Sequence, residues 1–155
     1  IKINRSVATI GDDQKHCRQR RNYSNRQDSN RQASTAMNYF KRTIDGEIGT
    51  LEFDTPDSSA NILSSAALTE LGQHLDEIAL RSDIKALLIT SAKKSIFIAG
   101  ADIKEIDSIT DPQEAIEKCN SGKQVINKLE QLPQTTVAVI NGACLGGGYE
   151  LSLAC

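Results

Sequence analysis

Two short apolar segments, both rich in β-branched residues, most constrain how this chain can fold. They are "IKALLITSA" (84–92) and "TTVAVING" (135–142). Continuously apolar runs of this length are typical of strands buried on both faces. Between them, residues 112–132 have an apolar stripe at helical spacing, and Pro112 suits a first helical turn. Buried strands alternating with helices predict an α/β protein.

Further elements flank this unit on both sides. Residues 41–54, "KRTIDGEIGTLEFD", have two alternating runs around Asp45-Gly46, which predicts a β-hairpin. Residues 65–80 have leucines at helical spacing, and a last helix is predicted from near Gly148. Because that helix has only about two turns, we interpret residues 37–155 as the N-terminal portion of a domain that is incomplete at its C-terminus.

Residues 1–36 differ from the rest in composition. They hold eight Lys and Arg against three Asp and Glu, although the whole chain has a net charge of -2. Without an apolar period, they are interpreted as a disordered basic extension. We interpret this extension as sequence translated from upstream of Met37, without a function of its own. The alternatives are an RNA-binding arm and an organelle presequence.

The bulk composition excludes several classes of protein. The chain has 155 residues, of which 39% are hydrophobic and 25% charged. These values indicate a soluble globular protein of one domain at most. No apolar run approaches the ~18 residues of a membrane span. The four cysteines have no CxxC spacing and the two histidines lie far apart, which argues against a zinc site and favours reduced thiols in a cytosol-like compartment.

Two glycine-containing segments follow predicted strands, "FIAGAD" (97–102) and "CLGGGYE" (144–150). A junction of this kind leaves backbone N–H groups free to bind negative charge. Two such donors on one oxygen would form an oxyanion hole. Phosphate is the alternative ligand, but neither GxGxxG nor GxxxxGK[ST] is present. A purely structural alternative is that the glycines allow close packing of a strand against a helix.

Longer segments around these glycines resemble a known family. "SAKKSIFIAGADIKEI" (91–106) and "AVINGACLGGGYELSLAC" (138–155) are similar to the two signature segments of the crotonase (enoyl-CoA hydratase/isomerase) family. Within it they most resemble the hydratase/isomerase part of multifunctional α subunits of fatty acid oxidation complexes. The resemblance extends from about Phe40 to Cys155. It implies the crotonase-like ββα spiral, an α/β fold, of which only the N-terminal part is present.

The resemblance also implies roles for individual residues. The N–H groups of Ala101 and Gly147 would hold the thioester oxygen. Glu150 corresponds to the first of two catalytic glutamates, and the second is expected after Cys155. The residues implied to line the substrate pocket are Ile98, Ala99, Gly100, Asp102, Ile103, Lys104, Gly146 and Gly148.

The implied reaction is hydration of 2-trans-enoyl-CoA to 3-hydroxyacyl-CoA in fatty acid β-oxidation. No metal or other cofactor is implied, and the expected partner is an acyl-CoA substrate rather than nucleic acid. The parent protein is expected to be a homotrimer or hexamer, or the α subunit of an αβ complex, in the bacterial cytoplasm or the mitochondrial matrix. Δ3-Δ2 enoyl-CoA isomerisation is one alternative, and an inactive chain with a binding role is another. The isolated chain is expected to be inactive.

Four further residues have structural interpretations. Asp102 and Glu105 have the spacing of a capping box, in which each side chain binds the other's backbone N–H. Asn61 is expected to satisfy backbone groups of its loop. Cys144 is expected to be a small core residue rather than a nucleophile.

Overall fold

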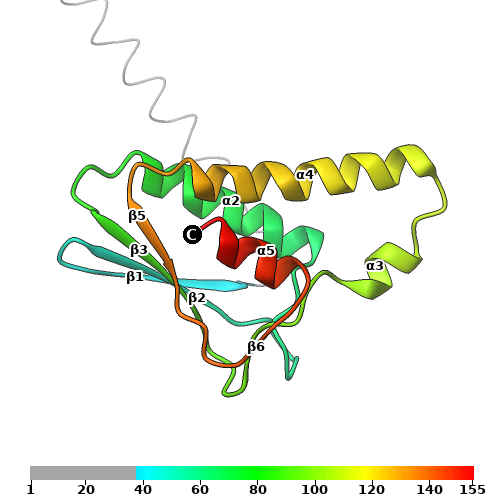
Figure 1. The fold of residues 1–155 in the computed structure, drawn as a ribbon, viewed down its shortest axis with the longest axis horizontal. Helices are drawn as coiled ribbons and strands as arrows, with labels where there is room; N and C mark the ends of the chain where they lie inside the picture. Colours follow the sequence, from blue (N-terminus) through cyan, green and yellow to red (C-terminus); the bar gives the residue numbers. More distant parts are fainter. Residues whose placement is uncertain (1–37) are drawn as a thin grey trace, which may run out of the picture. The chain divides into compact units, whose positions relative to one another are not determined.

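A computed structural model describes residues 38–155, and the interpretation of residues 1–36 lies outside this range. Figure 1 shows the arrangement of the described elements. They are β1 (Phe40–Asp45), β2 (Ile48–Phe53), α2 (Ser65–Ala79), β3 (Ala86–Ser91), β4 (Ile96–Ile98), α3 (Ile103–Asp107), α4 (Pro112–Glu130), β5 (Thr135–Ala138), β6 (Ala143–Cys144) and α5 (Gly147–Leu153).

The main sheet has the strand order β1-β2-β3-β5. β1 and β2 are antiparallel, whereas β2 pairs in parallel with β3, and β3 in parallel with β5. The two apolar segments therefore lie side by side, with Ala86 opposite Thr135 and Ile89 opposite Ala138. This arrangement confirms the predicted α/β class and the parallel strands. In β3, Leu87 and Ile89 are buried, but no residue of β5 is, so the predicted burial of residues 135–138 on both faces is wrong in residues 38–155, which place no second layer over that strand.

The hairpin between β1 and β2 forms as predicted, but its turn lies one residue later. Asp45 pairs with Ile48, so the two-residue loop is Gly46-Glu47 rather than Asp45-Gly46. Gly46 has a φ of 56°, a value that glycine adopts without steric cost. The positive φ that the first turn position needs therefore places Gly46, rather than Asp45, at that position.

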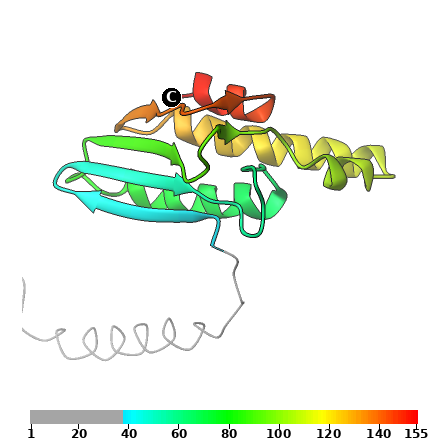
Figure 2. The same cartoon turned by 90° about the horizontal axis from the view of Figure 1, so that it is seen from below.

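Two helices, α2 and α4, run side by side over one face of the main sheet (Figures 1 and 2). α2 begins at its N-cap Ser64, whose side chain accepts a hydrogen bond from Ala67 N. Its buried stripe includes Leu71, Leu75 and Ile78. Burying each such side chain contributes about 1.5–3 kcal/mol, so amphipathic spacing holds this helix on the sheet.

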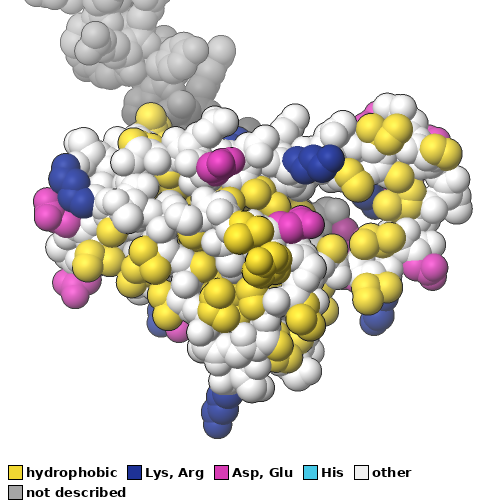
Figure 3. Space-filling view, in the orientation of Figure 1, with side chains coloured by type: hydrophobic (Ala, Val, Ile, Leu, Met, Phe, Trp, Pro, Cys, Tyr) yellow, Lys and Arg dark blue, Asp and Glu magenta, His cyan; other side chains and the backbone are white. Residues whose placement is uncertain are grey.

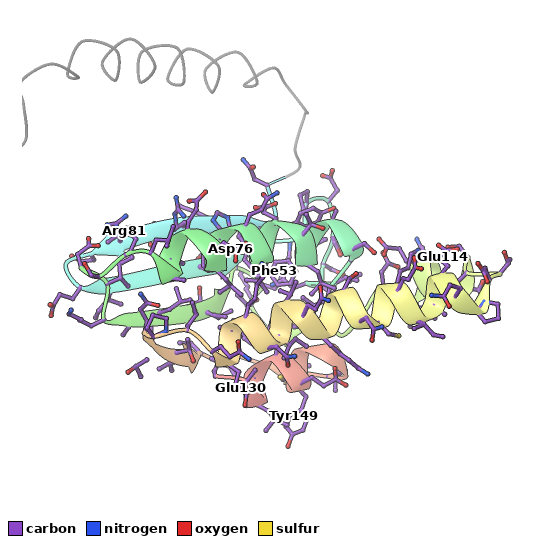
Figure 4. The ribbon with its side chains drawn as sticks, turned by 90° about the horizontal axis from the view of Figure 1, so that it is seen from above. Phe53, Asp76, Arg81, Glu114, Glu130 and Tyr149 are labelled. Atoms are coloured by element: carbon purple, nitrogen blue, oxygen red, sulfur yellow. The ribbon has the colours of Figure 1, made fainter. Side chains whose placement is uncertain are left out.

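Phe53 lies at the centre of the core beneath these helices (Figure 4). Its ring stacks on that of Phe40, the residue opposite it on β1, with centroids 4.5 Å apart. Glu70 of α2 binds the start of β1. Its carboxylate accepts hydrogen bonds from the backbone N–H groups of Tyr39 and Phe40, both at 2.9 Å. The hairpin and the first helix are therefore joined by both apolar and polar contacts.

A second sheet, which the sequence pattern did not predict, consists of β4 and β6. The chain leaves the main sheet after Val139, whose N–H still donates to Ile89 O, and then reaches β4, where Ala143 N donates to Ser95 O. An ideal Cβ at Gly142 would lie 2.1 Å from Ser95 O, so only glycine fits this crossing. β5 consequently ends at Ala138, four residues short of the predicted strand.

Apolar side chains remain exposed over β5, β6 and α5. They gather near the centre of the view in Figure 3, and the large ones are Val137, Val139, Ile140, Leu145, Tyr149 and Leu153. Tyr149 points away from the fold (Figure 4). Among the described helices none has both the length and the apolar composition needed to cross a membrane.

Candidate active site

The two glycine-containing loops lie against each other. Leu145 N donates to Ile98 O at 3.0 Å, which joins the loop after β6 to the end of β4. Further along, a Cβ added to Gly146 would lie 3.7 Å from Gly100 Cα. Segments more than forty residues apart in sequence therefore form the two sides of one site.

The amide of Ala101 is held in a fixed direction. Leu63 N donates to Gly100 O at 2.9 Å, and Asp102 N donates to Leu63 O at 3.3 Å. Because the C=O and N–H of a trans peptide point in opposite directions, the N–H of Ala101 points away from Leu63. Within residues 38–155 it donates no hydrogen bond.

The amide of Gly147 is held in the same way. The carbonyl of Gly146 accepts from Tyr149 N at 2.9 Å and from Glu150 N at 3.1 Å, and so points into α5. The N–H of the same peptide, which belongs to Gly147, therefore points out of the helix. It too has no acceptor within the described residues, and a Cβ built on Gly147 would lie 3.9 Å from Ala101 N.

At each of the three consecutive glycines, a different constraint excludes a side chain. Gly146 has a φ of 49° and a ψ of -123°, a region that is closed to residues with a side chain. A Cβ at Gly147 would come within 3.3 Å of Leu63 and would cover the approach to the Ala101 amide. A Cβ at Gly148 would lie 2.6 Å from Ile98 Cβ. The packing explanation thus accounts for Gly148, and the open site for Gly147.

Glu150 lies in the first turn of α5, three residues after Gly147. It is exposed, and its carboxylate has no hydrogen-bond partner among residues 38–155. A carboxylate one helical turn from the free N–H of Gly147 can bind a water molecule and take up its proton. The described residues contain no cluster of His, Cys, Asp or Glu that could hold a metal ion.

The remaining predicted pocket residues differ in where they lie. Gly100 and Gly146 lie in the loops that lead to the free amides, Gly148 lies in the first turn of α5, and Ala99 is exposed next to Gly100. The side chain of Ile98 is buried beneath Gly148, so only its backbone faces this region. Ile103 and Lys104 are exposed on α3.

Asp102 caps α3, accepting from Lys104 N at 2.9 Å and Glu105 N at 3.4 Å, but the predicted capping box is only half formed. The carboxylate of Glu105 does not return to Asp102. It accepts instead from Ser65 N at 3.0 Å and from the Ser65 hydroxyl, at the start of α2. Glu105 therefore joins α3 to α2, a tertiary contact that local spacing could not reveal.

Leu63 and Asn61 were not predicted to belong to this site. Asn61 does satisfy backbone groups as expected, but its partners extend to three strands. No local pattern indicated that residues 61–63 would pair with residues 99–102, because the two segments are almost forty residues apart. Cys144 is half-buried and packs against the core, as expected, with its thiol 3.2 Å from the Ser152 hydroxyl.

Comparison with known proteins gives a consistent result. Residues 43–155 match the family described as enoyl-CoA hydratase/isomerase. Over 111 residues the chain is 44% identical to the fatty acid oxidation complex subunit alpha of Shewanella halifaxensis, covering 72% of this chain and 16% of that protein. The chain thus spans about a sixth of the length of this relative.

Solved structures of similar fold agree with this match. An enoyl-CoA hydratase from Bacillus anthracis superposes with a TM-score of 0.71 at 32% identity, over 76% of this chain and 45% of the other. An enoyl-CoA hydratase/carnithine racemase from Magnetospirillum magneticum superposes with a TM-score of 0.72 at 27% identity, over 77% and 45%. Both the crotonase-like fold and the resemblance noted in the sequence are confirmed, and the chain belongs to the enoyl-CoA hydratase/isomerase family.

Proposed function

We propose that residues 38–155 supply the oxyanion hole and one proton-transferring carboxylate for hydration of 2-trans-enoyl-CoA to 3-hydroxyacyl-CoA. The thioester oxygen accepts hydrogen bonds from Ala101 N and Gly147 N. The observation that carries the proposal is that these two amides lie next to each other, each without an acceptor within the described residues.

The chemistry requires these groups in this arrangement. As the oxygen of water bonds to C3 of the enoyl group, the π electrons move through C2 toward the thioester oxygen. Two preorganised donors stabilise the resulting negative charge, and removing one such donor typically costs about 10²–10³ in kcat. Glu150 takes the proton from the attacking water. A second acid returns a proton to C2, and by resemblance this is a glutamate that follows Cys155.

We also propose a setting for this reaction. Relatives from Shewanella halifaxensis and Aliivibrio fischeri are named as fatty acid oxidation complex subunit alpha, which supports a role as part of such a subunit. An acyl-CoA is then the substrate and a β subunit the partner, in the bacterial cytoplasm.

The proposal can be tested with a chimera. Residues 43–155 would replace their counterpart in the Shewanella halifaxensis subunit, and crotonyl-CoA hydration would be followed by loss of the enoyl-thioester absorbance. We expect the chimera to hydrate crotonyl-CoA, with residues 43–155 of this chain supplying the oxyanion hole. A chimera that unfolds at the same temperature as the unmodified relative but hydrates no crotonyl-CoA would contradict the proposal. Turnover confined to a 3-enoyl-CoA would indicate isomerisation instead.

A further inference from the structure

Asn61 is the one polar residue of the described range with no solvent exposure at all. Its side-chain oxygen accepts from Thr55 N at 2.9 Å. Its amide nitrogen lies within hydrogen-bond distance of Phe53 O at 2.9 Å, Ser91 Oγ at 2.9 Å and Phe97 O at 3.2 Å. The orientation of the amide is fixed by these partners, because a backbone N–H needs an oxygen and two carbonyls need a donor.

These partners belong to three different strands. Phe53 is the last residue of β2, Ser91 the last of β3, and Phe97 lies in β4. The hydroxyl of Ser91 extends the network, since it donates to Ile96 O at 2.7 Å. One side chain therefore joins the main sheet to the small sheet, where the carboxyl ends of β2 and β3 meet β4.

The backbone that begins at Asn61 continues directly to the candidate oxyanion hole. Asn61 O accepts from Ala99 N at 2.8 Å. Two residues later, Leu63 forms a parallel bridge with Ala101, in which Leu63 N donates to Gly100 O. This last bond sets the direction of the Ala101 N–H, because the two groups belong to one trans peptide. The Asn61 side chain is thus connected to the Ala101 amide through residues 62 and 63 and the hydrogen bond from Leu63 N to Gly100 O.

We infer that Asn61, supported by Ser91, is a positioning residue that holds the Ala101 amide in place for the thioester oxygen. The inference rests on the proposed function of that amide. Asn61 itself makes no contact with substrate. Its effect arises because a displacement of about 1 Å in a catalytic group can cost on the order of 10²-fold in rate. Buried polar networks of this kind are rigid when every member is satisfied, as Asn61 is.

A matched control distinguishes positioning from stability. Gln134 is also a buried amide, whose nitrogen donates to Ile78 O at 2.9 Å and Arg81 O at 3.0 Å. It directly precedes β5, at the end of the sheet opposite the carboxyl ends that Asn61 joins. Replacing either amide by alanine removes buried hydrogen bonds, but only one replacement affects the path to Ala101.

The experiment compares Asn61→Ala, Ser91→Ala and Gln134→Ala in both the 155-residue chain and the chimera described above. The probe is the CoA thioester of 4-(dimethylamino)cinnamic acid, whose absorption moves to longer wavelength when its carbonyl oxygen accepts hydrogen bonds. Turnover of crotonyl-CoA is measured in parallel in the chimera.

We expect Asn61→Ala to lose most of the wavelength shift and to lower kcat by about 10- to 100-fold, with KM changed no more than about two-fold. Ser91→Ala, which keeps the Asn61 side chain, should have the same effects in smaller degree and provides the test if Asn61→Ala does not fold. Gln134→Ala should lower the unfolding temperature while retaining the shift and kcat.

Two results separate failure of this inference from failure of the proposed function. If the unmodified forms shift the probe and both Asn61→Ala and Ser91→Ala retain the shift and kcat, Asn61 is structural only, and the proposed function stands. If neither unmodified form shifts the probe, the oxyanion-hole proposal fails and the positioning role fails with it.

Discussion

Gly148 of α5 packs so closely on Ile98 of β4 that an added Cβ would lie 2.6 Å from Ile98 Cβ and 2.8 Å from Ile98 O. Neither neighbour can move easily, because the Ile98 side chain is buried and its carbonyl accepts from Leu145 N. This contact sets the distance between α5, which begins with Gly147, and the strand that leads to Ala101.

The first prediction follows from this contact. Gly148→Ala should lower the free energy of unfolding by about 1–3 kcal/mol, the usual cost of overpacking. Gly122→Ala is the matched control, since its Cβ would meet only Leu68 Cδ1, at an ordinary 3.7 Å, and α4 should gain up to about 1 kcal/mol. Chemical denaturation measures both variants. Equal changes in the free energy of unfolding of the two variants would show that the contact of Gly148 with Ile98 does not exclude a larger side chain.

The second prediction separates proton transfer from binding. Glu150→Gln in the chimera should lower kcat for crotonyl-CoA hydration by about 10²–10⁴-fold, because the amide keeps the size of the side chain but cannot take up a proton. Affinity for a CoA thioester, measured by calorimetry, should change little. Glu117→Gln, on the exposed surface of α4, is the control and should leave kcat unchanged. Hydration that survives Glu150→Gln would remove Glu150 from the mechanism.

The third prediction concerns two cysteines. Burial raises the pKa of the Cys155 thiol to about 11, and a hydrogen bond with Thr136 opposes this only in part. Only the thiolate is a strong nucleophile, so the reactive fraction of Cys155 stays small until the pH approaches that pKa. Cys119 is exposed on α4.

At pH 8, iodoacetamide should therefore modify Cys119 well before Cys155, as followed by peptide mass spectrometry. Raising the pH toward 10, or adding denaturant, should increase the rate at Cys155. A Cys155 that reacts as fast as Cys119 in the folded chain at pH 8 would contradict the burial of its thiol.

The fourth prediction is negative. The 155-residue chain alone should not hydrate crotonyl-CoA above background, because the proposed mechanism gives a proton-transfer role to one carboxylate of residues 38–155, that of Glu150, and hydration also needs a second acid for C2. The assay is run beside the chimera at equal concentration. Turnover in a homogeneous sample of the chain would mean that one carboxylate suffices.

The sequence by itself determined the identity and order of most elements. Residues 65–79 and 112–130 form helices because their apolar residues recur at helical spacing, and residues 86–91 and 135–138 form strands because they lie in short apolar runs rich in β-branched residues. Two segments with glycine at a strand end were also enough to indicate a family, because both occur in order and on the expected elements. These features depend on residues close together in the sequence, so the local pattern is enough to predict them.

Only the tertiary structure decided the parts that depend on contacts between distant segments. β5 ends at Ala138 because the chain crosses to β4 at Gly142, and the small sheet that results has no local pattern. Glu105 binds Ser65 rather than its own helix start, since the fold brings the hydroxyl and N–H of Ser65, forty residues earlier, within reach of its carboxylate. The direction of the Ala101 amide depends on Leu63, and that pairing depends on a buried Asn61 that joins three strands. A hydrogen bond between residues almost forty positions apart forms only when the whole sheet has brought them together, and sequence spacing carries no information about it.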